Sequence, residues 1–130
     1  MTIRKEIVTD KACKPGSLYS QGVIVDDWVF VSGQGALDIN GKVIPNLDMK
    51  QQTRMAMDYI KAILEAAGAS MGDVVKVNAH ITDHALFADY NEVYQQYFEP
   101  PFPARTTVVS GLAPHMLVEI DVIAKLRKGN

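Results

Sequence analysis

The sequence predicts an α+β fold in which two helices cover one face of a β-sheet. Three observations support this fold class. An amphipathic helical stripe extends from Asp48 to Gly68, and a clean strand-type alternation follows at residues 73–82. The predicted order along the chain is strands, helix, strand, helix and two strands, which fits helices packed on one side of a sheet. We expect one domain that spans residues 1–130.

Composition limits the classes of function. The chain has 130 residues, of which 48% are hydrophobic and 22% charged, enough to bury a core. A net charge of -2 and a pI of about 5.9 argue against a general nucleic-acid binder, which needs a basic surface. No apolar run approaches the roughly 18 residues of a membrane span. The first residues lack the apolar core of a signal peptide, and the single Cys13 excludes an internal disulfide. We therefore expect a cytoplasmic protein that binds neither nucleic acid nor membrane.

The segment before residue 48 predicts short strands. They are expected over residues 1–9, 22–25 and 28–33, with a turn at Asp26-Asp27 between the last two. In the third strand Trp28 and Phe30 share one face, while Val29 and Val31 share the other. Apolar residues on both faces predict a strand that is covered on both sides. Asn40-Gly41, between short apolar pieces, predicts a two-residue hairpin turn.

Two helices follow from helical spacing. In the first, Asp48 is the expected N-cap and Gly68 the expected left-handed residue after the end. Its apolar stripe consists of Ala56, Ile60, Ile63, Leu64 and Ala67. The second helix is capped by Asp83 and stops before Pro100-Pro101. Its stripe consists of Phe87, Tyr90, Tyr94, Tyr97 and Phe98.

The last strands carry the polar residues of interest. Residues 105–110 and 116–126 predict two strands that the segment "GLAPH" joins as a turn. If they pair as a hairpin with Ser110 opposite Met116, Thr107 faces Glu119 and Arg105 faces Asp121 on one sheet surface. Such a cluster is either a cross-strand ion pair or a site in which the guanidinium keeps N–H groups free for a ligand carboxylate. The residue pattern alone favours neither alternative.

Asn91 is a further polar residue at a position where the pattern predicts an apolar one, on the stripe of the second helix. We expect a buried amide that bonds to the backbone.

Metal and nucleotide motifs are not expected. The glycines of the loop-like segment 35–42 are separated by five residues instead of four. His80 and His84 straddle a strand end and a helix start, and His115 and Cys13 are remote in sequence, which argues against a zinc site.

Six segments, in order and with similar spacing, resemble the reactive intermediate deaminase family, also called RidA or YjgF. They are "YSQG" from Tyr19, "VFVSGQ" from Val29, "VVKVNAHITD" from Val74, "FADYNEVYQQYF" from Phe87, "PART" from Pro103 and "VEIDVIA" from Val118. The resemblance covers nearly the whole chain. It implies a chorismate-mutase-like fold, a mixed sheet backed by two helices, assembled as a homotrimer with sites between subunits.

The resemblance also implies an activity. Family members hydrolyse enamines and imines such as 2-aminoacrylate, 2-iminopropanoate and 2-iminobutanoate to 2-oxo acids and ammonia, without cofactor or metal. By position, Arg105 matches the arginine that holds the substrate carboxylate, and Glu119 the glutamate that positions and activates the attacking water. Tyr19 matches a tyrosine that reaches the cleft. The segment before it reads "GSLYSQ" where many members have "GPYSQ", so one residue is inserted.

Four further residues are implied in substrate binding. Ser32 and Gly33 match the segment that lines the cleft, and Asn91 matches a helix asparagine near the site. Thr107 stands where many members have cysteine, and it can take that place if the position acts through its backbone carbonyl.

Two other functions stay open. The altered loop at Tyr19 and Thr107 allow the same reaction on another acid, as in an aminoacrylate or 2-aminomuconate type deaminase. A non-catalytic trimer that binds a carboxylate metabolite is the second alternative. Ribonuclease activity has also been claimed for relatives, and the acidic pI of this chain argues against it.

Overall fold

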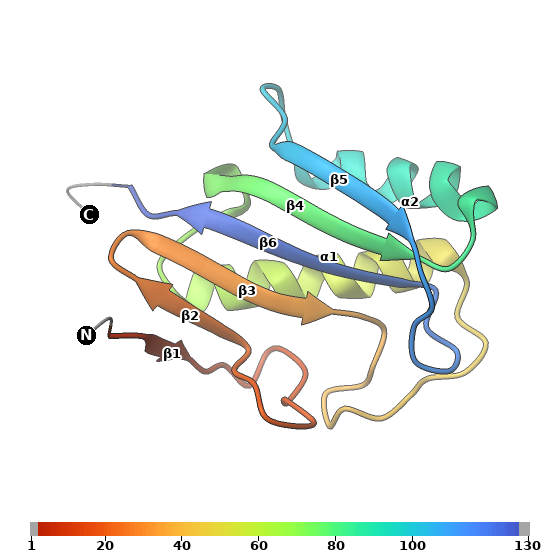
Figure 1. The fold of residues 1–130 in the computed structure, drawn as a ribbon, viewed down its shortest axis with the longest axis horizontal. Helices are drawn as coiled ribbons and strands as arrows, with labels where there is room; N and C mark the ends of the chain where they lie inside the picture. The colour runs from red at the N-terminus through yellow and green to blue at the C-terminus, as the bar shows by residue number, and fades with distance from the viewer. Residues whose placement is uncertain (1–2, 128–130) are drawn as a thin grey trace.

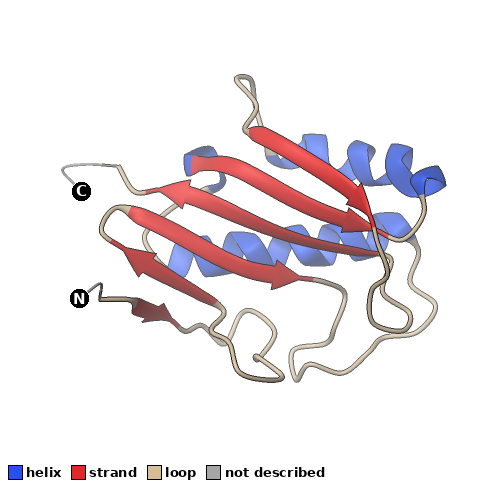
Figure 2. Cartoon of the chain, in the orientation of Figure 1, coloured by secondary structure: helices blue, strands red, loops and turns tan. Residues whose placement is uncertain are grey.

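The computed structural model describes residues 3–127, which form a six-stranded sheet with both helices on one face (Figures 1 and 2). The strands are β1 Lys5–Ile7, β2 Gly22–Val25, β3 Trp28–Gln34, β4 Val74–Ile81, β5 Ala104–Val109 and β6 Val118–Lys125. Their order in the sheet is β1-β2-β3-β6-β4-β5. Only β4 and β5 pair in parallel, and the other named pairs are antiparallel. The α+β prediction, a mixed sheet backed by two helices, is confirmed.

Helix α1, Met49–Ala66, begins and ends where the sequence predicts. The Asp48 carboxylate accepts a hydrogen bond from the Gln51 backbone N–H, and the Gln51 side chain accepts one from the Asp48 N–H. Gly68 takes the left-handed conformation with φ +86°. Of the predicted stripe, all members but the half-buried Ala67 are fully buried. Helix α1 therefore forms the centre of the core against the sheet.

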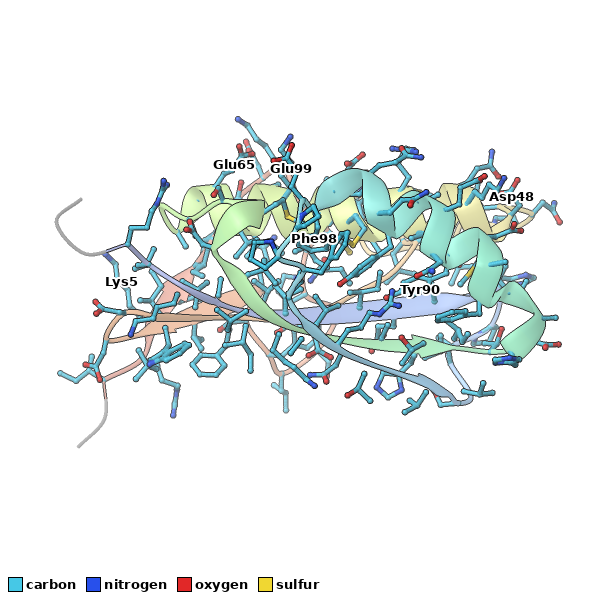
Figure 3. All side chains as sticks on the ribbon, turned by 90° about the horizontal axis from the view of Figure 1, so that it is seen from above. Lys5, Asp48, Glu65, Tyr90, Phe98 and Glu99 are labelled. Carbon is cyan, nitrogen blue, oxygen red and sulfur yellow. The ribbon has the colours of Figure 1, made fainter. Side chains whose placement is uncertain are left out.

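Helix α2, Phe87–Tyr94, is shorter than predicted and is flanked by 3₁₀ turns at His84–Leu86 and Gln95–Tyr97. Asp83 caps the first turn by accepting from the Ala85 N–H. The predicted aromatic stripe forms a row of neighbouring rings. The centroid distances are 6.0 Å for Phe87–Tyr90, 5.5 Å for Tyr90–Tyr94 and 4.9 Å for Tyr94–Phe98. The row lies between α2 and the sheet, where Figure 3 labels Tyr90.

The predicted hairpin between the last two strands is wrong, because β4 lies between β5 and β6. The segment at 110–117 passes the end of β4. The Ser110 N–H donates to the Ile81 carbonyl, and the Thr82 N–H donates to the Leu117 carbonyl. Neighbouring strands lie about 4.8 Å apart, so a connection of this length easily bypasses one strand.

The face of the sheet opposite the helices is open in the single chain. Residues 3–127 cover β3 on one side only, so the expected cover of its second side does not come from this part of the chain. Val29 and Val31 are buried under the helices, whereas Trp28 and Phe30 on the other face are 39% and 40% exposed. Figure 3 shows both helices on one side of the sheet and no helix on the other. Two large aromatic side chains therefore lie on a surface that no element of residues 3–127 covers.

Smaller differences have local causes. A register shift between Val74 and Lys76 places Val74 on the buried face of β4 and leaves the predicted Val75 42% exposed. Asn40-Gly41 does form a turn, with Gly41 at φ +84°, but it closes a single bridge between Leu37 and Val43 instead of a strand pair. The first strand is limited to β1, and residues 1 and 2 of its predicted range lie outside the described part. No helix of residues 3–127 is long and apolar enough to cross a bilayer.

Candidate active site

Arg105 lies on the helix side of the edge strand β5. It stands opposite Val77 of β4, which is fully buried under the helices. Its guanidinium carbon is 4.7 Å from the ring centroid of Tyr94, 5.5 Å from that of Phe87 and 5.8 Å from that of Tyr90. Its Nη1 donates a hydrogen bond of 2.6 Å to Oδ1 of Asn91. Helix α2 therefore surrounds one side of the guanidinium with rings and one amide.

The prediction of a buried, backbone-bonded Asn91 is wrong. The residue is exposed, and its side-chain oxygen accepts from Arg105. Tyr90, Val93 and Tyr94 take the buried positions of α2. Asn91 follows Tyr90 by one residue and is turned by about 100° around the helix axis. This rotation places the amide at the rim of the aromatic row, beside the arginine.

Three buried hydroxyl groups lie on the same side of β5 as Arg105. They belong to Tyr90, Tyr94 and Thr107, and none of them has a hydrogen-bond partner within the described part of the chain. Thr107 stands opposite the buried Ala79, so it faces the helices. The hairpin register had predicted that it faces Glu119. A buried hydroxyl without a partner costs about 1–3 kcal/mol. The surroundings of Arg105 are thus polar but uncharged.

The two tyrosines remain neutral phenols at physiological pH. Burial raises the pKa of Tyr94 to about 12, with a smaller contribution in the same direction from Tyr90 and an opposite one from the Arg105 charge. Burial likewise raises the pKa of Tyr90, against the lowering effect of the Arg105 charge. Arg105 consequently meets no phenolate, and no acidic side chain forms a salt bridge with it among residues 3–127.

Alkaline pH should destabilise the fold through Tyr94. Its pKa of about 12 exceeds the ordinary value of 10.0, so its contribution is complete below pH 10 and is lost as the pH rises toward 12. A shift of this size corresponds to about 2–3 kcal/mol. Urea unfolding at several pH values between about 9 and 12 should therefore show a steeper loss of stability in the wild type than in Tyr94→Phe. Equal slopes would contradict the assignment to Tyr94.

A second group of predicted residues lies on the open face of the sheet. A cavity of about 600 Å³ is lined by residues that include Tyr19, Ser32, Gly33 and Glu119. Glu119 in β6 is half-buried and stands opposite His80 of β4, whose side chain also faces the open side. Its carboxylate lies directly over Gly33, because a Cβ built there would be 2.7 Å from Oε2 of Glu119. The glycine leaves the space that the carboxylate occupies.

Ser32 attaches the loop that carries Tyr19 to the sheet. Its Oγ donates to the Ser20 carbonyl at 2.6 Å, and its N–H donates to the Gln21 carbonyl at 2.9 Å. Tyr19 is 48% exposed, and its hydroxyl accepts from the Gly16 N–H at 3.3 Å. The residue inserted before Tyr19 therefore does not remove this tyrosine from the cavity.

Two features of the candidate site were not predicted from the sequence. Gln21 is buried, and its side chain exchanges hydrogen bonds with the backbone of Thr9 and donates to the carbonyl of Cys13, which anchors the loop before Tyr19. The aromatic residues of α2 were assigned to the core by their spacing. Their contact with Arg105 depends on the place of β5 in the sheet, which the spacing does not reveal.

Arg105 and Glu119 lie on opposite faces of the sheet, so the predicted cluster of an arginine with two carboxylates is wrong. Asp121 accepts a hydrogen bond from the Asn78 side chain at 3.1 Å on the open face. The predicted site residues therefore fall into two groups. The helix-side group contains Asn91, Arg105 and Thr107, and the open-face group contains Tyr19, Ser32, Gly33 and Glu119.

Comparison with known proteins identifies the family. The family model described as Endoribonuclease L-PSP matches residues 9–126, which include both groups. A 2-iminobutanoate/2-iminopropanoate deaminase of Dermatophagoides farinae is 37% identical over 124 residues, 95% of this chain and 97% of the relative. The chain belongs to the RidA/YjgF family. A RutC family protein of Pyrococcus abyssi is 46% identical over 122 residues, 92% of this chain and 96% of that protein.

A solved RidA structure shares the whole fold. The crystal structure of RidA from an Antarctic Psychrobacter species superposes with a TM-score of 0.87 at 40% identity and covers 95% of this chain and 100% of that one. The mixed sheet and the placement of both helices on one face are thus those of the RidA family. The relative from Dermatophagoides farinae is named a deaminase, whereas the family model is described as an endoribonuclease.

Proposed function

We propose that this protein hydrolyses small 2-imino and enamino acids to 2-oxo acids and ammonia. The substrates would be 2-aminoacrylate with its tautomer 2-iminopropanoate, and 2-iminobutanoate. The observation that carries the proposal is the state of Arg105, whose single hydrogen-bond acceptor within residues 3–127 is the neutral amide of Asn91. A guanidinium has five N–H donors, so an edge of the fork is free to bind a carboxylate with two parallel bonds.

The site would be completed by two subunits of a homotrimer. Arg105 and Glu119 face opposite sides of one sheet, so one chain cannot bring them to the same substrate. The outer edge of β5 pairs with no strand of the described chain, and Trp28 and Phe30 are exposed on the open face. Contact between two different surfaces generates a ring when the rotation closes. A trimer in which the β5 edge of one copy meets the open face of the next joins the two groups.

The chemistry needs few groups. Arg105 holds the carboxylate, and Glu119 accepts a proton from a water molecule as the water oxygen attacks the imine carbon. The C=N electron pair moves to nitrogen, which takes this proton back from Glu119 to give a carbinolamine. Transfer of the hydroxyl proton to the amino group, again through Glu119, lets the C–N bond break, so that ammonia leaves and the C=O of the 2-oxo acid forms. A well-placed general base contributes roughly 10²–10⁴-fold, and fixing the substrate next to the water adds to this. None of these steps needs a cofactor.

Longer acids are tested as well, because Thr107 stands where many members have cysteine and one residue is inserted before Tyr19, which lines the open-face cavity. A 2-aminomuconate type intermediate is therefore the second candidate substrate. A ribonuclease function gains no such support, since the chain has a net charge of -2 and RNA binding draws on a basic surface.

The test generates 2-iminobutanoate in situ with threonine dehydratase and follows its loss by semicarbazide trapping. The wild type should accelerate the loss, while Arg105→Ala and Glu119→Ala should lower the rate by at least about 100-fold. Arg54→Ala is the matched control, because Arg54 is another exposed arginine that lies over a tyrosine ring, 5.9 Å from the centroid of Tyr97.

Absence of acceleration by the wild type would contradict the proposed substrate, and extended imino acids would then be compared. Binding of a 2-oxo acid that survives Glu119→Gln, without turnover of any imino acid by the wild type, would identify a non-catalytic carboxylate-binding trimer instead.

A further inference from the structure

We infer that Phe87, Tyr90, Asn91 and Tyr94 act as positioning residues, which together form a neutral clamp that sets the affinity of Arg105 for the carboxylate of the substrate. The inference rests on the proposed function and extends it from the arginine to the helix behind it. We call these four residues the clamp.

The clamp is built from one helix. Its members follow one another at positions i, i+3, i+4 and i+7 of α2, so a single rigid element presents all four groups on one side. The guanidinium carbon lies 4.7 Å from the ring centroid of Tyr94 and within 6 Å of the other two, at 5.5 and 5.8 Å. Ring faces attract a cation at such distances. Asn91 adds the one directional bond, at 2.6 Å, and thereby selects the orientation of the planar fork.

Every member of the clamp is uncharged. A carboxylate in place of Asn91 would form a bidentate pair with the guanidinium and compete with the substrate for it. The phenols of Tyr90 and Tyr94 stay protonated at physiological pH, as burial raises the pKa of both. The acidic groups of the same helix, Asp89 and Glu92, are exposed, and Glu92 pairs with Lys50. The clamp thus orients Arg105 while its positive charge stays available.

Orientation is needed because Arg105 lies on an exposed edge strand. A free arginine side chain samples many rotamers, and a ligand that selects one of them loses affinity. The rings of Tyr90 and Tyr94 are themselves fixed by burial, at 0% and 5% exposure, so they can hold the arginine before the substrate arrives. This preorganisation should appear in KM more than in kcat, since in the proposed mechanism the clamp acts on Arg105 and on neither the imine carbon nor the water.

Steady-state kinetics on 2-iminobutanoate test this role. Tyr94→Leu should raise KM about tenfold with kcat within about threefold, because a ring face is lost. Tyr94→Phe should recover most of the lost affinity, because the ring is retained. Asn91→Asp should raise KM by at least about tenfold, and since Asn91 is exposed this variant should fold normally. Tyr97→Leu, which removes the ring next to Arg54, should leave KM unchanged.

An unchanged KM in both Tyr94→Leu and Asn91→Asp would overturn the inference. Equal losses in Tyr94→Leu and Tyr94→Phe would also overturn it, because the hydroxyl and not the ring would then matter.

A measurement that does not depend on turnover separates this inference from the proposed function. The Nε–H resonance of Arg105, assigned by its loss in Arg105→Ala, should be displaced by ring currents in the wild type and return toward the usual position in Tyr94→Leu. Addition of 2-oxobutanoate should shift it again in the wild type. A displaced resonance that responds to the 2-oxo acid in a protein without deaminase activity would support the clamp and contradict the catalytic proposal. A resonance at the usual position in the wild type would overturn the clamp, whatever the activity.

Discussion

Randomly assembled mixtures of Arg105→Ala and Glu119→Ala chains should regain about a quarter of the wild-type deaminase activity, although each variant alone is inactive. The reason is the division of the site between two faces of the sheet. Arg105 faces α2 beside Val77, and Glu119 faces the open side beside His80. If each site takes Arg105 from one subunit and Glu119 from its neighbour, random assembly at equal amounts leaves about one site in four with both groups intact.

The measurement mixes equal amounts of the two variants, which carry different affinity tags, unfolds and refolds them together, and compares the activity of the whole refolded mixture with that of wild-type protein treated in the same way. Capture of a sample through both tags in turn verifies that mixed assemblies form. Wild-type chains mixed with chains that carry both substitutions provide the matched control. A shared site leaves about a quarter of the sites intact in that mixture, whereas a site within one chain leaves about half. No recovery in verified mixed assemblies of the single variants, together with half activity in the control, would contradict the shared site.

The division could not be predicted from the residue pattern, for a physical reason. Strand β5 is an edge strand, and most of its residues are exposed on both faces, so its sequence carries no alternation that marks a buried side. The pattern of β6 is clear, with Val118, Ile120, Val122 and Ala124 all buried. The sequence therefore predicts which face of β6 is buried against the core, but it predicts neither the orientation nor the partner strand of β5.

Elements with local signals were predicted well. The capping box at Asp48 and the left-handed Gly68 depend on neighbouring residues only, and both were found. Asn91 was misplaced because the expected stripe gave α2 a slightly different rotation, and one residue of helix corresponds to about 100°. The open face of β3 was also missed. The apolar side chains of Trp28 and Phe30 predict that this face is buried. The pattern of a strand does not show whether the same chain or a second subunit buries it.

The resemblance to a family supplied what local patterns lacked. It named Arg105 and Glu119 as one site without reference to their strands, and the structure then separates them by the thickness of the sheet. A site whose members contact different layers of one chain is typical of an oligomer in which each interface joins two different surfaces. If the two residues serve one substrate, as proposed, their positions taken together constrain the assembly more strongly than either position does alone.

Substitution of Gly33 by alanine should reduce kcat by about 10- to 100-fold while the fold stays intact. A Cβ at this position would lie 2.7 Å from Oε2 and 3.0 Å from Cδ of Glu119, closer than carbon atoms tolerate. The atoms that it meets belong to the far end of a flexible side chain, so the carboxylate moves and the backbone does not. A displaced Glu119 can no longer take the proton of the attacking water in line with the imine carbon, since general-base catalysis depends on hydrogen-bond distance.

Gly111→Ala is the matched control, because a Cβ there meets nothing within 4 Å. Gly22→Ala gives the opposite contrast, since its Cβ would lie 2.9 Å from the backbone oxygen of Phe30, which cannot move without the strand. We expect Gly22→Ala to lower the thermal midpoint and Gly33→Ala to lower kcat with a thermal midpoint close to that of the wild type. Full activity in Gly33→Ala would show that the position of the Glu119 carboxylate is not critical. It would contradict the proposal that Glu119 is the general base.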